Sequence, residues 1–129
     1  MITTHNSSSL FYIKSGYGKK VLLLFHGFGQ DHTVFMPLMD SLKDEYTCYA
    51  FDLYFHGESR WAGGEQPLEK QVWKETLNTF LNENQIDRFS VLGFSLGGKF
   101  ALASVEMFSE RIQELLLVAA DGVKISFWY

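Results

Sequence analysis

Two spacings of apolar residues alternate along the chain. Some apolar residues stand side by side in short runs, which is typical of strands that are buried on both faces of a sheet. Others recur every three or four positions, which is typical of amphipathic helices. The runs predict strands at residues 10–13, 21–25, 46–53, 88–94 and 111–120, and the wider spacing predicts helices at residues 34–42, 67–81 and 96–108. Because strands and helices alternate, we expect an α/β fold with right-handed crossovers, a mostly parallel sheet and helices on both faces.

The length of 129 residues and the composition favour one globular domain, since 47% of the residues are hydrophobic and 20% are charged. The 11 basic residues are interspersed among 15 acidic ones, so we expect no nucleic-acid partner. No apolar run approaches the ~20 residues of a membrane helix, and the N-terminus lacks the features of a signal peptide. Cys48 is the single cysteine, which excludes an internal disulfide. These features predict a cytoplasmic protein without a membrane partner.

Residues 93–97 have the sequence G-F-S-L-G, which fits the pattern G-x-S-x-G, and they lie between a predicted strand and a predicted helix. A serine on such a sharp turn has a strained backbone, so its flanking positions must be small, as Gly93 and Gly97 are. The N-terminus of the following helix supplies N–H groups and a partial positive charge that stabilise an oxyanion. The pattern favours Ser95 as a nucleophile. The alternative is a glycine-rich helix start with an incidental serine.

Two further motifs accompany this turn. Residues 26–30 have the sequence H-G-F-G-Q, and residues 52–59 have the sequence D-L-Y-F-H-G-E-S. The three motifs together resemble those of the α/β-hydrolase family, whose pattern D-x-x-G-H-G-x-S has a glycine where this chain has Phe55. The resemblance extends over residues 10–122.

The resemblance implies a serine hydrolase that cleaves an ester, thioester or similar acyl bond of a small molecule through an acyl-enzyme at Ser95. It also implies that the backbone N–H groups of Phe28 and Leu96 form an oxyanion hole, in which each donor is worth about 3 kcal/mol of the barrier. It implies no cofactor. Because Phe28 and Phe94 flank the nucleophile, an apolar acyl group is expected. The expected lining of the site consists of His26, Gly27, Phe94 and Asp121.

The four histidines do not predict a metal site. The resemblance gives His26 a role in shaping its loop, and we expect a structural role for His56 as well. We expect His5 and His32 at the surface. A metal site formed by His26, His32, His56 and Asp52 is the alternative, but no His-x-His pair or helical i, i+4 pair supports it.

The acid and the base of the family follow the nucleophile in the sequence, yet no histidine follows Ser95. Asp121 follows the last predicted strand at its carboxyl end, where sites in open α/β sheets form, and is therefore a candidate member of the site, although the family usually has its acid one strand later. The family's cap segment begins near the aromatic residues 127–129. We therefore expect residues 1–129 to be the N-terminal part of a hydrolase domain, without the cap and the C-terminal strands, and the isolated chain to be inactive.

Residues 115–118 are all apolar, which suits an interior strand better than the edge of a sheet. We therefore expect self-association or a companion fragment that covers this edge. A non-catalytic, hydrolase-like module that binds a ligand or a partner is the alternative function. A reading frame that continues past Tyr129 to a late aspartate and a late histidine favours the enzyme, whereas a stop codon favours the binding module.

Overall fold

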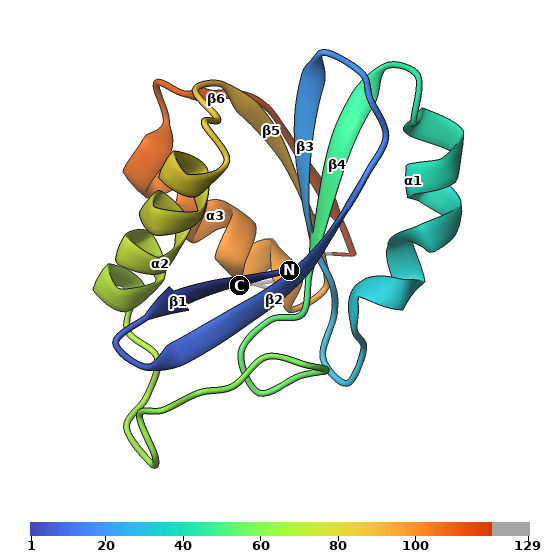
Figure 1. The fold of residues 1–129 in the computed structure, drawn as a ribbon. Coiled ribbons are helices and arrows are strands. Elements are labelled where there is room, and N and C mark those ends of the chain that lie inside the picture. The colour runs from blue at the N-terminus through green and yellow to red at the C-terminus, as the bar shows by residue number, and fades with distance from the viewer. Residues whose placement is uncertain (120–129) are drawn as a thin grey trace, which may run out of the picture.

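The apolar runs of the sequence form the middle of one sheet (Figure 1). The computed structural model describes residues 1–119, and the six strands of this part join in the order β1-β2-β4-β3-β5-β6. The four strands from β4 to β6 are parallel, and β2 and β1 extend the sheet by antiparallel pairing. The strands are β1 (Ile2–His5), β2 (Ser8–Ser15), β3 (Lys20–Phe25), β4 (Tyr46–Phe51), β5 (Phe89–Phe94) and β6 (Ile112–Val118).

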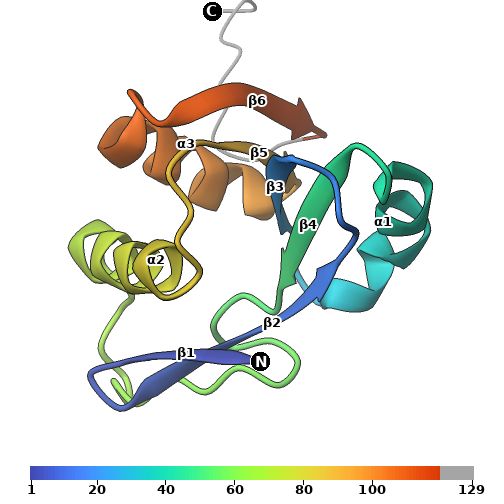
Figure 2. The ribbon, with the colours of Figure 1, turned by 45° about the horizontal axis from the view of Figure 1, so that its top comes forward.

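Helices connect the parallel strands and cover both faces of the sheet. Helix α1 lies on one face, whereas α2 and α3 lie on the other (Figure 2). The predicted α/β class is therefore confirmed. Within the described residues, no helix is long and apolar enough to cross a membrane. The helical segments are the 3-10 turn η1 (His32–Phe35) and the helices α1 (Met36–Leu42), α2 (Lys70–Glu83) and α3 (Gly97–Phe108).

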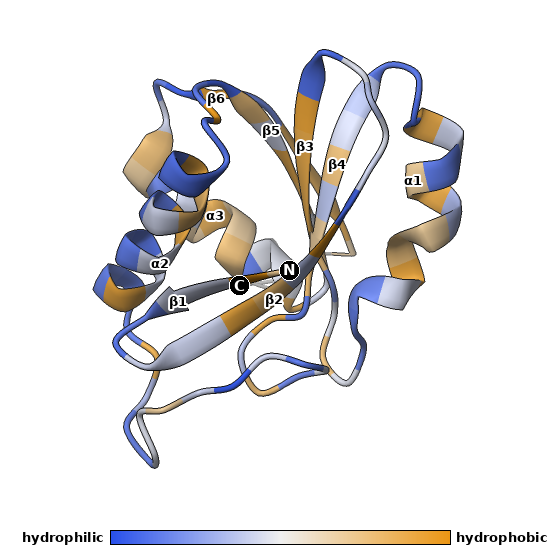
Figure 3. Ribbon diagram, in the orientation of Figure 1, coloured by the Kyte–Doolittle hydropathy of each residue, from blue (hydrophilic) through white to orange (hydrophobic). Residues whose placement is uncertain are grey.

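Each face of the sheet has its own hydrophobic core, because successive side chains of a strand point to opposite faces. In the central strand β3, Leu23 joins the cluster that contains Trp73 of α2, whereas Leu24 joins the cluster that contains Met39 of α1. Both helical residues and both leucines are almost fully buried. Strands β3 and β5 are hydrophobic over most of their length (Figure 3), as expected for strands that are covered on both sides.

Strand β1 lies in a segment where no strand was predicted, and it contains His5. The buried side chain of this strand is Thr3, whose Oγ1 donates a hydrogen bond of 2.8 Å to Glu83 of α2. Asn6 and Ser7, with φ angles of 49° and 68°, form the two-residue turn into β2. Such a pair of positive φ angles suits a tight hairpin. Because the buried residue is polar, hydrophobic alternation does not reveal this strand.

The predicted helix at 34–42 is divided into the turn η1 and the short helix α1. The carboxylate of Asp31 caps η1 by accepting the N–H of Thr33 at 2.8 Å. Pro37 lies in the first turn of α1, where its missing N–H breaks no helical hydrogen bond. The segment is therefore helical throughout, but it changes from a 3-10 helix to an α-helix at Met36, the residue before the proline.

Several other boundaries differ from the predicted ones. Strand β2 extends two residues beyond the predicted segment 10–13 at each end, and α2 ends two residues later than predicted. Helix α2 begins at Lys70 and not at Pro67. Strand β4 ends at Phe51, two residues before the predicted end. The N–H of Leu53 donates to the Nε2 of His26 at 2.9 Å, so it is not available to a neighbouring strand.

Strand β6 forms the edge of the sheet among the described residues. It is two residues shorter than predicted at its C-terminal end and one residue shorter at its start. Leu115, Leu116 and Val118 are exposed by 37%, 45% and 47%. Residues 1–119 therefore leave the apolar run of this strand open on its outer edge.

Candidate active site

The carboxyl ends of β3 and β5 bring two of the sequence motifs together. The two strands are parallel neighbours, and Phe25 pairs with Gly93 at their last shared position. The segment after β3 therefore lies beside the turn after β5. A Cβ atom placed on Gly27 would lie 3.2 Å from the Cβ of Ser95 and 3.2 Å from the Cδ2 of Phe94. Only a residue without a side chain allows this approach of the loop to the serine.

Ser95 occupies a strained turn between β5 and α3. Its φ is 53°, in the left-handed region that non-glycine residues rarely adopt. The carbonyl of Ser95 accepts the N–H of Gly98 at 2.8 Å, and its own N–H donates to Val118 of β6 at 3.0 Å. These bonds hold the turn from both sides. Ser95 is half-buried and follows the carboxyl end of β5, so it does not lie within the core.

The two glycines that flank the serine allow α3 to pack against the sheet. A Cβ on Gly93 would lie 2.5 Å from the carbonyl oxygen of Gly97. A Cβ on Gly97 would lie 2.0 Å from the carbonyl oxygen of Phe25. Both contacts are to backbone atoms, which cannot move aside as a flexible side chain could. The steric requirement that the sequence suggested for these two positions is present in the structure.

The loop after β3 is closed by Gln30. Its Oε1 accepts the N–H of Gly27 at 2.8 Å, and its N–H donates to the carbonyl of Gly27 at 3.2 Å. Gly29 has a φ of 76°, which completes the tight turn. Within residues 1–119, no hydrogen bond engages the N–H of Phe28 or that of Leu96. These two amides are the ones that the resemblance assigns to an oxyanion hole.

His26 is fully buried, and both of its ring nitrogens are bonded. The Nδ1 lies 2.7 Å from the carbonyl of Gly27, and the Nε2 lies 2.9 Å from the N–H of Leu53. A ring that donates from Nδ1 and accepts at Nε2 satisfies both contacts and is neutral. Burial is the main reason why the pKa of His26 lies below its usual value. The ring therefore joins two loops and has no free nitrogen for proton transfer.

His56 has a similar place on the second loop. Its Nε2 accepts the N–H of Gly29 at 3.0 Å, and its Nδ1 lies 3.1 Å from the carbonyl of Tyr54. Its ring stands edge-on to the rings of His26, at 4.9 Å between centroids, and of Phe28, at 5.7 Å. His56 thus connects the loop after β4 to the loop that carries the candidate oxyanion-hole donor.

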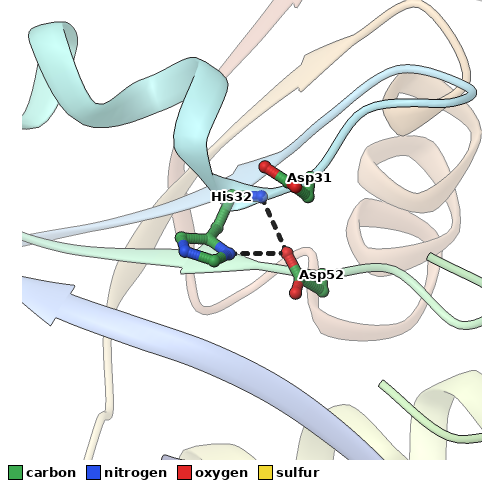
Figure 4. A group of neighbouring side chains, drawn as sticks. All are labelled: Asp31, His32 and Asp52. Carbon is green, nitrogen blue, oxygen red and sulfur yellow. Dashed lines mark hydrogen bonds and ion pairs between the residues drawn. The ribbon is translucent and has the colours of Figure 1, made fainter. Parts of the chain in front are cut away.

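His32 is half-buried, with its side chain 20% exposed, and it is bonded to the buried carboxylate of Asp52 (Figure 4). The Oδ1 of Asp52 accepts the backbone N–H of His32 at 2.7 Å and contacts its ring Nδ1 at 2.8 Å. The Oδ2 accepts the N–H of Glu58 at 2.8 Å. A Cβ on Gly57 would lie 2.1 Å from the same oxygen. Asp52 therefore fixes both loops of the site through one carboxylate.

Asp31, His32 and Asp52 offer potential metal ligands that all lie within 4.8 Å of one another (Figure 4). Of the four residues weighed from the sequence, only His32 and Asp52 belong to this group. The Oδ1 of Asp31 already accepts two hydrogen bonds from Thr33, and the carboxylate of Asp52 is engaged at both oxygens. The arrangement is explained by the capping of η1 and by the joining of the two loops.

A hollow of about 330 Å³ lies beside the serine turn, between the segment η1–α1 and the strands β5 and β6. It is mainly apolar, and Gln30 and Phe94 connect it to the loop and to the turn just described. Asp121, which was expected to line the site, lies outside the described residues. The lining of the hollow consists of Gln30, Val34, Phe35, Leu38, Leu92, Phe94 and Val118.

The structure thus brings together the six predicted site residues that it describes. Sequence reasoning missed Gln30, although it directly follows the H-G-x-G motif, because no pattern indicates that its side chain folds back on the loop. It also missed the pairing of His32 with Asp52, which are 20 residues apart. The residues brought together are His26, Gly27, Phe28, Phe94, Ser95 and Leu96.

Comparison with known proteins agrees with this geometry. A protein of Mycobacterium tuberculosis described as uncharacterized is 30% identical over 121 residues, which are 94% of this chain and 34% of that protein. A pimeloyl-[acyl-carrier protein] methyl ester esterase of Edwardsiella ictaluri is 28% identical over 114 residues, 88% of this chain and 42% of that protein. A hydrolase from Pseudomonas aeruginosa of known crystal structure is similar at a TM-score of 0.84 and 22% identity, over 98% of this chain and 48% of that one.

The chain spans less than half of the length of each of these three proteins. Residues 20–128, which include the strands of the parallel sheet and all three motifs, match the family model described as alpha/beta hydrolase fold. The match covers most of the chain, and the order and direction of the strands agree with it. The chain therefore belongs to the alpha/beta hydrolase fold family.

Proposed function

We propose that this chain carries the nucleophile and the oxyanion hole of a serine hydrolase that cleaves an ester, thioester or similar acyl bond. The observation that carries the proposal is the turn at Ser95, a non-glycine residue at a φ of 53° between β5 and α3. Strained residues of this kind cluster at active sites. The short distance between Gly27 and Ser95 adds support, since it brings the loop that contains Phe28 next to the turn that contains Leu96.

In the proposed reaction, the Oγ of Ser95 attacks the carbonyl carbon while its proton passes to a histidine base. The N–H groups of Phe28 and Leu96 donate to the oxyanion that forms. Collapse of this intermediate breaks the acyl bond, and the leaving alcohol or thiol takes up the proton from the base. Water then attacks the acyl-enzyme in the same way and releases the acid. The name of the Edwardsiella relative, a methyl ester esterase, supports an ester as the substrate.

In this proposal the base comes from outside this chain. His26 and His56 use both ring nitrogens within the loops, and His32 is bonded to Asp52 through its Nδ1. No histidine follows Ser95 in these 129 residues. Loss of a triad histidine lowers turnover by about 10⁶, although an oxyanion hole and binding alone leave about 10³ to 10⁴ over water. The isolated chain of 129 residues is therefore expected to be close to inert.

A fluorophosphonate probe tests the proposal, because it labels an activated serine and ignores an ordinary hydroxyl. The protein should be produced as its gene encodes it, including any sequence that follows Tyr129. We expect labelling of this protein, loss of labelling in Ser95→Ala and full labelling in the control Ser109→Ala, which changes an exposed serine at the end of α3. Equal labelling with and without Ser95 would contradict the proposal.

The second candidate function is a hydrolase-like module that binds a ligand without turnover. The gene distinguishes the two. A reading frame that continues to a late aspartate and a late histidine supports the enzyme, whereas a stop codon after Tyr129 supports the binding module. Strong labelling of the isolated chain at Ser95 would show that a base is present within it, and would contradict the expected inactivity.

A further inference from the structure

Phe55 occupies a position where the fold would be better served by glycine. Its φ is 75°, in a region where a side chain is strained, and the related family motif has a glycine at this place. The ring is 63% exposed, so burial does not compensate for the strain. A residue that is both strained and exposed does not contribute to stability, and strain of this kind points to function.

The ring of Phe55 rests on a fixed aromatic support. It lies 5.7 Å from the ring of Trp61, which in turn lies 5.2 Å from the buried ring of Tyr54. Trp61 is held by a hydrogen bond of 3.2 Å from its Nε1 to the carbonyl of Gln66. Gly63 packs against the indole, where an added Cβ would lie 2.4 Å from a ring carbon. The orientation of Trp61, the half-buried partner of the exposed Phe55, is therefore set before any ligand binds.

This aromatic pair is joined to the candidate active site. His56 follows Phe55 in the chain and accepts the N–H of Gly29, so the two loops touch at this point. The ring of Phe28 stands edge-on to His56 at 5.7 Å and is 82% exposed. A Cβ placed on Gly27, the residue before Phe28, would lie 3.2 Å from the Cβ of Ser95. Two exposed aromatic side chains thus belong to the two loops that His56 joins: the ring of Phe28 stands against the ring of His56, and Phe55 precedes His56 in the chain.

We propose that Phe28, Phe55 and Trp61 form an aromatic rim that binds the apolar part of the substrate, and that Phe55 determines specificity for esters with a large apolar group. The inference rests on the proposed function of Ser95 for the chemistry, but not for the binding. The apolar part is either the acyl chain or the alcohol, since both extend from the scissile carbonyl. Aromatic side chains suit this role because they offer a large rigid surface with few rotatable bonds.

Two series of esters test the proposal on the protein as its gene encodes it. In one series of methyl esters the acyl chain lengthens from acetyl to octanoyl, and in one series of acetates the alcohol grows from methyl to benzyl. Each methylene that reaches the rim should raise kcat/KM about fourfold. Removing the ring in Phe55→Gly should remove contact with two methylenes and lower kcat/KM about 15-fold for the largest esters, with methyl acetate changed less than about twofold.

The control is Ile2→Ala, which removes an exposed apolar side chain from β1 and should leave both series unchanged. Phe55→Gly should also unfold at the same or a higher temperature, because it relieves the positive φ. The rim is supported if kcat/KM of Phe55→Gly rises less steeply with ester size while the variant is as stable as the unaltered protein or more so. An unchanged dependence of kcat/KM on ester size, or an equal loss of kcat/KM on every ester, would overturn it.

Binding separates this proposal from the proposed function. Decanoate and benzyl acetate should bind to Ser95→Ala and quench tryptophan fluorescence, with at least about tenfold weaker binding when Phe55→Gly is added. If the unaltered protein cleaves no ester but Phe55→Gly weakens this binding, the rim stands and the hydrolase proposal fails. If esters are cleaved but Phe55→Gly changes neither binding nor the slopes, the rim fails and the hydrolase proposal stands.

Discussion

Asp52→Asn is expected to destabilise the protein by about 3 kcal/mol, because the carboxylate joins the two loops of the site through three contacts. Asparagine has one carbonyl oxygen. If this oxygen faces His32, the amide NH₂ faces the N–H of Glu58, and two donors then oppose each other. A buried donor without a partner costs about 1–3 kcal/mol. The two contacts to His32 also lose the charge of their acceptor, which weakens each by about 1 kcal/mol, and the relief of the buried charge offsets part of this loss.

The measurement is urea unfolding at neutral pH, followed by circular dichroism, with the slope of the transition checked for constancy. Asp40→Asn is the matched control, since Asp40 is exposed and forms a surface ion pair with Lys43 one turn away. This control should leave the midpoint nearly unchanged. His32→Ala alone and in combination with Asp52→Asn should give effects that do not add, because the two residues share a contact. If Asp52→Asn unfolds like the unaltered protein, Asp52 does not organise the loops.

Three further predictions concern the packing of α3, the burial of His26 and the open edge of β6. Gly97→Ala should prevent α3 from packing and lower the thermal midpoint by more than 10 °C or abolish folding, because the new Cβ would lie 2.0 Å from the carbonyl oxygen of Phe25; a variant that melts like the unaltered protein would show that α3 can move. Because burial lowers the folded-state pKa of His26, the unfolded state binds its proton first as the pH falls below 6.5. Stability is therefore highest above this pH and decreases below it. His26→Gln should show a smaller decrease in the free energy of unfolding between neutral pH and pH 5, as measured by urea denaturation. The isolated chain should self-associate through β6, where Leu115 and Leu116 are exposed, and Leu116→Lys should reduce this association in sedimentation; a monomer at micromolar concentrations would contradict it.

The parts of the fold that the sequence predicted are those with local patterns. The runs at 21–25 and 88–94 are mostly apolar because β3 and β5 are covered on both faces. An apolar run of this kind identifies a buried strand directly from the sequence. The turn at Ser95 was predictable for a similar reason. Its glycines are required by contacts with backbone atoms, so the spacing of the glycines in the motif indicates the geometry of the turn.

The parts that the sequence did not reveal depend on pairing in space. Thr3 is buried because it donates to Glu83, and a polar residue in a buried position gives no hydrophobic signal. The contact between His32 and Asp52 was not predicted, because the two residues follow different strands and are 20 positions apart in the sequence. Phe55 did leave a signal, since it replaces the glycine of the related motif, but only its φ and exposure show that the replacement keeps the strained conformation.

The position of β3 between β4 and β5 has a consequence for synthesis of the chain. One edge of β3 pairs with β4, which follows after about 20 residues, whereas the other edge pairs with β5, whose Gly93 follows Phe25 by about 70 residues. At about 5–20 residues per second, a ribosome needs roughly 4–14 seconds to bridge that interval. During this time the nascent chain presents an apolar strand with one unpaired edge, and the turn at Ser95 does not yet exist. Early chaperone binding should therefore centre on β3, and it should end when β5 has left the ribosome.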